Sequence, residues 1–255
     1  CEDLAMSIVE EIKCSNCGGP IKFNPGEIIA TCQYCGFTAV IETGEAFTFE
    51  HSMILNEFDP VQVEKPIRDW MRSGFVKPGD LARSSKILEK NLMYLPFWII
   101  HVNVVSEYKG VFERLTPSTV KEGKIEKEYN WLVLAREATQ FPTKEYDIPL
   151  EGKIPYDFRR IEGFAKVLNS EISKEDAVDI AKQEIEELHQ FLAKEFADKI
   201  IEMKNEFSIS DTLYLHAPIW FIVYEYKGKM YNIFLDGAAG AVIKGDIPSK
   251  GFGIL

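Results

Sequence analysis

The sequence predicts an α+β protein built from three parts, and three observations support this fold class. Two Cys-x-x-Cys pairs stand near the N-terminus with 14 residues between them. Later, apolar residues recur over one long segment at the spacing of an α-helix, and runs rich in aromatic and β-branched residues alternate with turn signals. We expect a small cysteine-bearing ribbon over 1–50, then two units over 51–160 and 161–255 that each combine a helix with an antiparallel meander.

The two cysteine pairs, Cys14 with Cys17 and Cys32 with Cys35, have the spacing of a structural zinc site. One Cys-x-x-Cys turn brings two sulfurs to an ion, and two turns supply four thiolates in a tetrahedron with no open position for chemistry. A glycine follows each pair, where a tight turn favours a residue without a Cβ. Two disulfides or four free thiols are the alternative. The predicted cofactor is one structural Zn²⁺, and the part over 1–50 is therefore predicted to be a zinc ribbon.

Short strand patterns surround the cysteines. The segments 21–23 and 28–30 flank a turn, and 37–41 supplies a third strand. We interpret 1–11 as a short helix or a tail. A unit this small buries too little apolar surface to fold unaided, so we expect metal binding to provide much of its stability.

The second part is predicted to hold a short helix and long β-structure. A helix is expected over 64–72, where a proline falls in the first turn and a glycine follows the last. The run 92–105 is rich in aromatic and β-branched residues but is shorter than a membrane span. We expect it to be a long twisted strand with Pro96 at an edge or bulge, and 130–134 to be another strand.

The third part is predicted to begin with a long helix. Ser173 is the expected N-cap, with two acidic residues in the first turn. Apolar residues then recur at steps of three and four from Ala181 to Phe207, which predicts a helix about 50 Å long. We interpret the apolar stripe as a face packed on a sheet, with a protein-binding groove as the alternative. Strands over 213–224, 230–235 and 241–243 complete the meander.

The second and third parts repeat one pattern. The tripeptides at 96–98 and 218–220 are Pro-Phe-Trp and Pro-Ile-Trp, and Tyr-Lys-Gly follows each of them. A helix precedes each copy, which indicates two diverged copies of one unit. Trp98 and Trp220 lie in runs too apolar to face water, so we expect both to be buried, at matching places on two sheets.

Composition limits the function and the location. The chain has 29 basic and 40 acidic residues, a net charge of −11. Since binding to a phosphate backbone depends on lysine and arginine density, nucleic acid is not the expected ligand. Cysteines in a metal pattern fit a reducing compartment, so we expect a cytoplasmic protein. Abundant lysine, glutamate and isoleucine with few amides is typical of thermophiles.

The sequence shows no familiar catalytic motif: it lacks His-Glu-x-x-His, Gly-x-Ser-x-Gly, the P-loop and Gly-x-Gly-x-x-Gly. His101 and His216 sit beside the two Pro-x-Trp segments, which could bring them near each other as structural hydrogen-bonding groups. Glu184, Glu186 and Glu187 are interpreted as a solvated helix face. We therefore predict no catalytic or cofactor-binding residue beyond the zinc ligands, and do not expect an enzyme.

Several motifs together resemble a family. Besides the cysteine pairs these are Tyr-Leu-Pro-Phe-Trp at 94–98, Ile-Pro-Tyr-Asp at 154–157 and Asp-Gly-Ala-Ala-Gly at 236–240. The chain resembles the bacterial and archaeal proteins named for a TFIIB-type zinc ribbon, and 173–248 is similar to a PepSY-like module. The second similarity implies binding of a protein or peptide, or restraint of a peptidase, without catalysis. Some relatives continue into membrane helices after the segment that corresponds to 245–248.

Three functions remain open. The first is a zinc-binding, non-catalytic protein-interaction or scaffold module with a protein or peptide partner. The second is a nucleic-acid or transcription-associated zinc-ribbon protein. The third is a peptidase-regulating PepSY-like protein, or an enzyme whose site lies between the two meanders. A peripheral association with the inner face of a membrane is a further alternative for its location.

Overall fold

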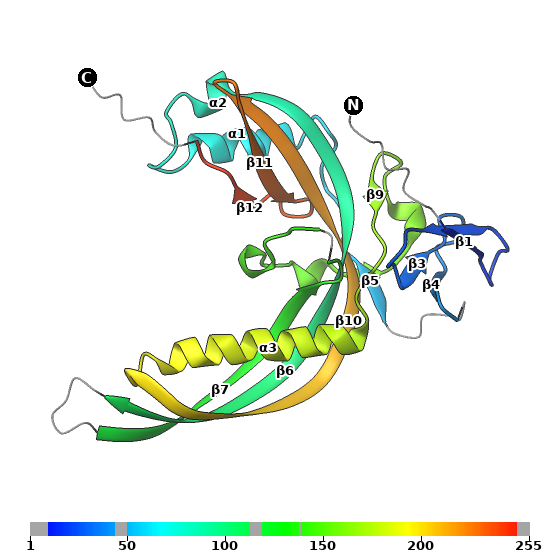
Figure 1. Ribbon diagram of the computed structural model, residues 1–255. Helices are drawn as coiled ribbons and strands as arrows, with labels where there is room; N and C mark the ends of the chain where they lie inside the picture. The colour runs from blue at the N-terminus through cyan, green and yellow to red at the C-terminus, as the bar shows by residue number, and fades with distance from the viewer. Residues whose placement is uncertain (1–9, 44–49, 113–118, 138, 249–255) are drawn as a thin grey trace, which may run out of the picture. The chain divides into compact units, whose positions relative to one another are not determined.

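The computed structural model describes residues 10–43, 50–112, 119–137 and 139–248 (Figure 1). Two hairpins that carry the four cysteines are followed by helices and a large, mainly antiparallel sheet, which confirms the α+β class. The described chain divides into two compact units. The first comprises parts of 1–96, 136–171 and 215–255, and the second comprises parts of 97–135 and 172–214.

The cysteine-bearing ribbon belongs to the first unit and consists of two hairpins. Strand β1 (Glu10–Lys13) pairs with β2 (Pro20–Phe23), and β3 (Ile29–Thr31) pairs with β4 (Thr38–Val40), both antiparallel. The ribbon therefore has four strands where three were predicted. Strand β1 forms because Ile12 pairs with Ile21 and adds an apolar side chain to the ribbon core. Of the predicted N-terminal helix or tail, 1–9 lies outside the described residues.

The remaining elements of the first unit surround a second apolar core. They are β5 (His51–Met53), α1 (Glu64–Arg72), α2 (Leu81–Ser84), η1 (Thr143–Glu145), η2 (Leu150–Gly152), β8 (Ile154–Pro155), η3 (Phe158–Arg160), β9 (Lys166–Val167), β11 (Lys229–Asp236) and β12 (Val242–Gly245). The buried face of α1, with Ile67 and Met71, belongs to one apolar cluster with Trp220, Ile233 and Leu235. This cluster shares no residue with the ribbon core, so the ribbon has an apolar core of its own.

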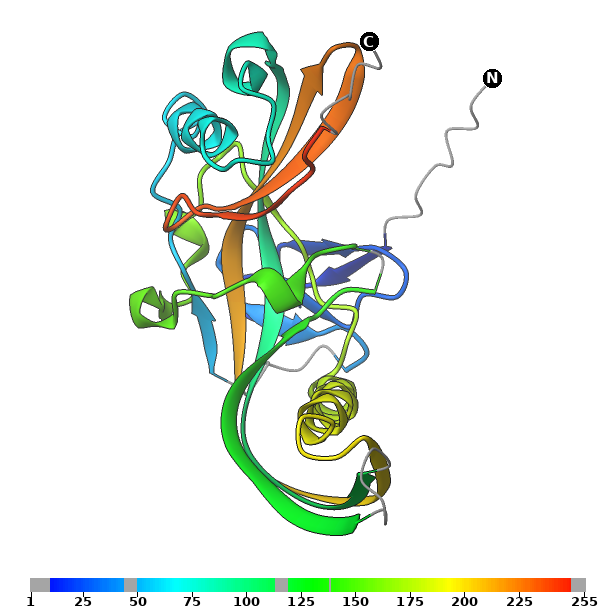
Figure 2. The same ribbon diagram turned by 90° about the vertical axis from the view of Figure 1, so that its left-hand side faces the viewer.

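The second unit is a curved sheet with one helix packed on it. Its strands are β7 (Thr119–Leu134) and parts of two long strands, β6 (Lys86–Phe112) and β10 (Lys199–Tyr226), which also contribute to the first unit. Helix α3 (Lys174–Ala193) lies within the curve of these strands (Figure 2). It turns a buried face that includes Ala181, Ile185 and His189 toward the strands.

The predicted start of the long helix is confirmed, but the predicted length is wrong. Ser173 Oγ accepts a hydrogen bond from the backbone N–H of Asp176, as an N-cap does. The helix ends at Ala193, and β10 begins at Lys199, inside the segment predicted to be helical. Ile200 and Met203 continue the three-and-four spacing, but they pack beside Tyr108 as strand residues. Apolar spacing over so few residues does not separate a helix from a strand.

The helices and meanders pair across the predicted parts. Helix α1 packs against β12, and α3 packs against β7, so each helix covers strands from the other predicted part. Strands β6 and β10 each enter both compact units. The three domain ranges, 1–50, 51–160 and 161–255, stay a prediction.

The two repeated tryptophans are both fully buried, as predicted. Trp98 pairs with Val133 in the β6–β7 hairpin, and Trp220 pairs with Leu235 in the β10–β11 hairpin. The prediction of two separate sheets is wrong, because β5 to β12 form a single eight-stranded sheet. Among the described residues, no helix has the length and apolar content needed to cross a membrane.

Candidate metal centre

The structure brings the four predicted ligands, Cys14, Cys17, Cys32 and Cys35, to one point. Their sulfur atoms all lie within 4.8 Å of one another. The Cys14 and Cys35 sulfurs are 3.6 Å apart, and the Cys17 and Cys32 sulfurs are 3.7 Å apart. A tetrahedron of sulfurs about 2.3 Å from a zinc ion has edges of about 3.8 Å. The sulfurs thus lie near the tetrahedral spacing and too far apart for the disulfide alternative, which requires a bond of about 2.05 Å.

The two cysteine turns have the same backbone geometry. In the first, the N–H of Gly18 donates to the carbonyl of Cys14 at 2.8 Å, and in the second the N–H of Gly36 donates to the carbonyl of Cys32 at 2.9 Å. Both glycines adopt a positive φ, of 74° and 76°, where a side chain would be strained. In each turn the first cysteine is buried and the second is exposed.

The crowding of the four sulfurs favours a bound cation. Desolvation raises the pKa of Cys35, but hydrogen bonds from the N–H of Phe37 and the side chain of Asn16, with others, lower it to about 6. The N–H of Gly19 lowers the pKa of Cys17, yet the neighbouring sulfurs outweigh it and raise this pKa to about 12. Four crowded sulfurs cannot all be thiolates alone. A bound divalent cation removes this conflict, because it stabilises every thiolate at once.

A buried ionic network holds the ribbon against the rest of the first unit. The carboxylate of Glu27 accepts hydrogen bonds from Arg136 at 3.0 Å and from the side chain of Asn169 at 2.7 Å. Arg136 also pairs with Glu171 at 2.6 Å. Desolvation raises the pKa of Glu27, but these partners and Asn24 lower it on balance, so the carboxylate stays charged. Breaking such a buried network leaves an unpaired charge, which costs several kcal/mol.

A second connection runs through a buried chain of hydrogen bonds. Thr38 Oγ1 lies 3.1 Å from His51 Nδ1, His51 Nε2 lies 2.9 Å from His216 Nδ1, and His216 Nε2 lies 2.9 Å from the carbonyl of Leu168. A carbonyl only accepts, so His216 donates from Nε2, and its Nδ1 accepts from His51. His51 in turn accepts from Thr38, and both imidazoles are neutral in this arrangement. Burial also favours the neutral imidazoles, because it lowers the pKa of both histidines. It lowers the pKa of His216 to about 4.

This chain predicts that stability falls with acidification. Because the folded state holds the pKa of His216 at about 4, below the ordinary 6.5, the unfolded state binds more protons below pH 6.5. The stabilisation is complete above pH 6.5 and is lost as the pH falls toward 4, with a full loss of about 3 kcal/mol. Urea unfolding of the zinc-loaded chain from pH 7.5 to 5.5 should show this fall. It should be weaker in His216→Gln but not in His101→Gln, because the raised pKa of His101 opposes the fall. An equal fall in both variants would contradict the assignment.

The other predicted histidine is not part of this chain. His101 belongs to the second unit and bonds Asn130 and Glu128, and the hydrogen bond that its ring donates to Asn130 Oδ1 is the main cause of its raised pKa. The partner of His216 is His51, which no sequence pattern marked as a functional residue. No motif links these two residues, which are 165 positions apart. The two histidines become neighbours only in the folded chain, where β5 and β10 lie side by side in the sheet.

A buried serine and histidine in the second unit do not form a nucleophilic site. Ser106 donates to Asn205 Oδ1 at 2.6 Å, so it accepts from His189 Nδ1, also at 2.6 Å. His189 Nε2 accepts from the hydroxyl of Tyr129 at 2.8 Å. A catalytic serine needs its histidine to accept the hydroxyl proton, which is the reverse of this arrangement. Ser106 and His189 are also fully buried.

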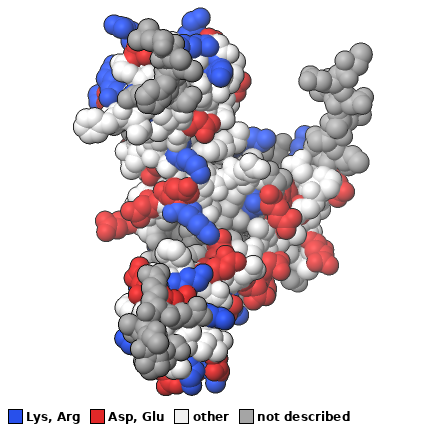
Figure 3. Space-filling model, turned by 60° about the vertical axis from the view of Figure 1, so that its left-hand side comes forward, with Lys and Arg blue, Asp and Glu red and all other residues white. Residues whose placement is uncertain are grey.

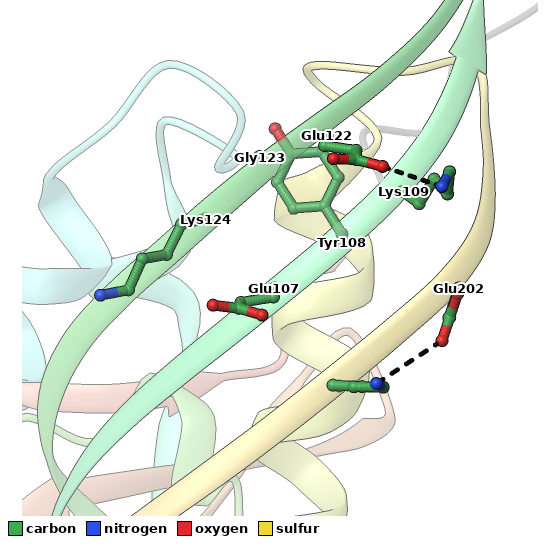
Figure 4. Close-up of a pocket in the computed structure, with 8 residues that line it drawn as sticks. Glu107, Tyr108, Lys109, Glu122, Gly123, Lys124 and Glu202 are labelled. Atoms are coloured by element: carbon green, nitrogen blue, oxygen red, sulfur yellow. Dashed lines mark ion pairs between the residues drawn. The ribbon is translucent and has the colours of Figure 1, made fainter.

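An open depression of about 510 Å³ lies on the second unit and is lined by charged pairs (Figure 4). Lys109 and Glu122 are 2.8 Å apart, and their pairing raises the pKa of the lysine and lowers that of the glutamate. The ring of Tyr108 lies against Gly123, where a side chain would collide with it. These shifts keep the charged forms in place, whereas acid–base chemistry requires a pKa moved toward neutrality.

Comparison of the chain with protein-family models, with curated proteins and with solved structures finds no match. The structure supports the resemblance to zinc-ribbon proteins at the cysteine hairpins alone, whose geometry is consistent with a zinc ribbon.

Proposed function

We propose that the four cysteines hold one structural Zn²⁺ and that the chain is a non-catalytic protein-interaction or scaffold module. The observation that carries the proposal is the closed donor set, in which four sulfurs within 4.8 Å of one another leave no coordination position for a substrate. Bound zinc would stabilise the thiolates and fix the two hairpins to each other. We expect the partner to be a protein or peptide, in a reducing compartment such as the cytoplasm.

The zinc site helps to present a surface because the ribbon is tied to the first unit by directional contacts. The N–H of Ile28 donates to the carbonyl of Ser170 at 2.7 Å, and the N–H of Ser170 donates to the carbonyl of Ile29 at 3.1 Å. With the Glu27–Arg136 network, these bonds fix the ribbon without using its exposed turns. A rigid, exposed turn on a fixed base is what a binding module requires.

Metal analysis tests the first half of the proposal. Protein purified under reducing conditions should hold one zinc per chain, with four sulfurs at about 2.3 Å by X-ray absorption. Absence of metal, or fewer than four sulfur ligands, would contradict it. For the second half, tagged chain mixed with host lysate should elute in a defined heavier complex. Elution at the mass of the free chain, at any lysate concentration, would contradict the interaction role.

A nucleic-acid role is the second candidate, favoured by one observation. Tyr34 is 69% exposed at the tip of the second cysteine turn, and Arg159 and Arg160 line an open depression beside Cys35. Aromatic and arginine side chains together bind single strands. Against it, the chain has a net charge of −11, and Figure 3 shows acidic and basic side chains interspersed on the face that it draws.

The two candidates predict different mobility shifts. Short DNA and RNA oligonucleotides at physiological salt should bind no more tightly than about 10⁻⁴ M, the weak range of non-specific contacts. Tyr34→Ala should leave this weak binding unchanged. Submicromolar binding that falls in Tyr34→Ala would favour the nucleic-acid role instead. The peptidase-regulating alternative stays a proposal that rests on the resemblance of 173–248 to PepSY-like modules.

A further inference from the structure

We propose that the connection between α1 and α2, over 73–80 in the first unit, docks the chain on an anionic lipid bilayer. Phe75 and Val76 would enter the interface of the bilayer, and the basic side chains around them would contact acidic headgroups. This activity goes beyond the proposed interaction function, because its ligand is a lipid surface and its residues lie outside the cysteine ribbon. Apolar anchors combined with basic groups are the chemistry that binds proteins to anionic membrane surfaces.

The tip of this connection presents apolar side chains to solvent. Phe75 is 99% exposed and Val76 is 67% exposed. Gly74 adopts a positive φ of 86° directly after α1, which turns the chain away from the helix axis. Apart from chain neighbours, no described residue has an atom within 4 Å of the place that a Cβ would take on Gly74 or Gly79. The connection therefore projects from the first unit (Figure 1).

The same connection buries its lysine. Lys77 is buried, its Nζ donates to the carbonyl of Trp70 at 2.5 Å, and it lies 3.7 Å from the centre of the Trp70 ring. Desolvation lowers the pKa of Lys77, so burial opposes its charge. In most loops the lysine is exposed and the phenylalanine is buried. The reversed placement holds Phe75 and Val76 outward, which favours an apolar binding partner at the tip.

The surroundings of the tip are basic, although the whole chain is acidic. The segment 64–90, which holds α1, α2 and the start of β6, carries seven basic and four acidic residues, a net charge of +3. The β10–β11 turn over 225–230 has a net charge of +1, and 242–248, which includes β12, has a net charge of zero. The chain as a whole carries −11. Figure 3 shows basic side chains at the top of the drawn face, the end at which Figure 1 draws α2.

The β10–β11 turn belongs to this surface because two contacts join it to the end of the connection. The hydroxyl of Tyr226 donates to Asp80 Oδ1 at 2.7 Å, and Lys227 Nζ lies 4.0 Å from Asp80 Oδ2. Lys229 is the cross-strand partner of Tyr226, so their side chains lie on the same face of the hairpin. Lys229 is also exposed, which makes it available to a ligand at this surface.

Basic groups remain available here because the acidic groups already have partners. Asp69 of α1 accepts from Lys65 at 2.8 Å and from Arg72 at 2.9 Å. In contrast, Arg83 and Lys229 are exposed and form no ion pair with another described residue. The attraction of one lysine or arginine to an anionic membrane surface corresponds to about a fivefold gain in binding. Several such groups around one apolar tip therefore favour acidic phospholipid over neutral phospholipid.

A bilayer fits this surface better than a folded acidic protein does. An aromatic anchor such as Phe75 needs a matching pocket when its partner is a protein. The interface of a bilayer accepts a projecting aromatic ring without a preformed pocket. Basic groups on separate segments around the tip also match negative charge that is spread over a plane. The inference therefore commits to a bilayer that contains acidic phospholipid.

Vesicle sedimentation with the full-length, zinc-loaded chain tests the inference. The probes are vesicles of phosphatidylcholine alone and vesicles of equal parts phosphatidylcholine and phosphatidylserine. We expect at least tenfold stronger binding to the mixed vesicles, and this binding should weaken as the salt concentration rises. Phe75→Ser should weaken it at least tenfold. Phe191→Ser is the matched control and should bind like wild type, because Phe191 is 65% exposed on α3 in the second unit.

Two further variants test the charge and the insertion. Lys229→Glu should weaken binding to the mixed vesicles at least fivefold. Its matched control is Lys204→Glu, at a side chain 77% exposed on β10 in the second unit, which should bind like wild type. Phe75→Trp should keep the binding, and its emission beyond that of wild type should shift to the blue and be quenched by brominated lipid. All these side chains are exposed, so the variants should melt like wild type.

Other results overturn the inference. Equal binding to the two kinds of vesicle, or binding to neither, rejects an anionic lipid surface. Equal loss in Phe191→Ser excludes this tip as the anchor, and emission from Phe75→Trp that brominated lipid does not quench excludes insertion. A lysate complex that Phe75→Ser abolishes, without vesicle binding, would make a protein the ligand instead. A lysate in which wild-type chain forms no complex contradicts the interaction function alone, and the vesicle results still decide the lipid surface.

Discussion

Replacing Cys14 by serine should unfold the ribbon and leave the rest of the described chain folded. The ribbon core contains two of the ligands themselves, Cys14 and Cys32, together with short apolar side chains such as Ala30 and Ala39. Structural zinc supplies about 10–16 kcal/mol of apparent binding energy in small zinc domains, which is folding energy. The core around α1 has its own apolar cluster and should keep its melting transition. Calorimetry should therefore show loss of one transition and retention of another.

Two comparisons make this result specific to the metal. A zinc chelator added to wild-type protein should reproduce the effect of Cys14→Ser. Ser15→Ala, a change at an exposed residue within the same turn, should keep one zinc per chain and both transitions. Loss of the entire thermal transition in Cys14→Ser would show that the ribbon and the remaining chain fold as one body. A Cys14→Ser protein that still held a full equivalent of zinc would remove the cysteine from the ligand set.

The metal centre could be predicted because its determinants are local. Each Cys-x-x-Cys turn is formed by six neighbouring residues, one of them a glycine with positive φ, and only the meeting of the two turns is non-local. The N-cap at Ser173 is local in the same way. Burial of Trp98 and Trp220 could be predicted because each stands in a long apolar run, which faces a core in any fold that buries it.

The connections that organise the first unit could not be predicted from the sequence. Glu27 and Arg136 are 109 positions apart, and His51 and His216 are 165 positions apart. Isolated charged and histidine residues are more often solvated or locally bonded, so nothing in the sequence marks them as partners. For a related reason, the sequence did not predict that α1 and α3 each pack on strands of the other predicted part. Apolar periodicity shows that α1 has a face to bury, but it does not show which strands will cover it.

The buried polar chain gives the ribbon a physical coupling to the first unit that apolar packing alone would lack. Thr31 Oγ1 lies 3.1 Å from Thr38 Oγ1, which continues the chain from His51 into the second cysteine hairpin. Each donor has one acceptor along this path, so the chain fixes orientation as well as distance. A ribbon that shifted against the unit would leave buried polar groups unpaired, at a cost of about 1–3 kcal/mol for each.

Replacing Trp220 by alanine should lower the free energy of unfolding by about 3–5 kcal/mol, the range for deleting a buried aromatic side chain. The Trp220 ring is fully buried, and its N–H donates to Asn56 Oδ1 at 2.9 Å. Alanine leaves a cavity and also an unpaired amide oxygen. Trp98→Ala should cost a similar amount in the second unit, where the Trp98 N–H donates to the carbonyl of Ile172 at 3.0 Å.

Urea unfolding combined with hydrogen exchange separates the two effects. Trp220→Ala should release amide protection in β10 and β11, and Trp98→Ala should release it in β6 and β7. Met230→Ala is the matched control on the β10–β11 hairpin, because Met230 is 62% exposed and should change stability by no more than about 0.5 kcal/mol. Trp220→Phe should recover part of the loss by filling the cavity without the hydrogen bond. If Trp220→Ala unfolds like wild-type protein and fails instead to hold a partner, Trp220 serves binding and not the core.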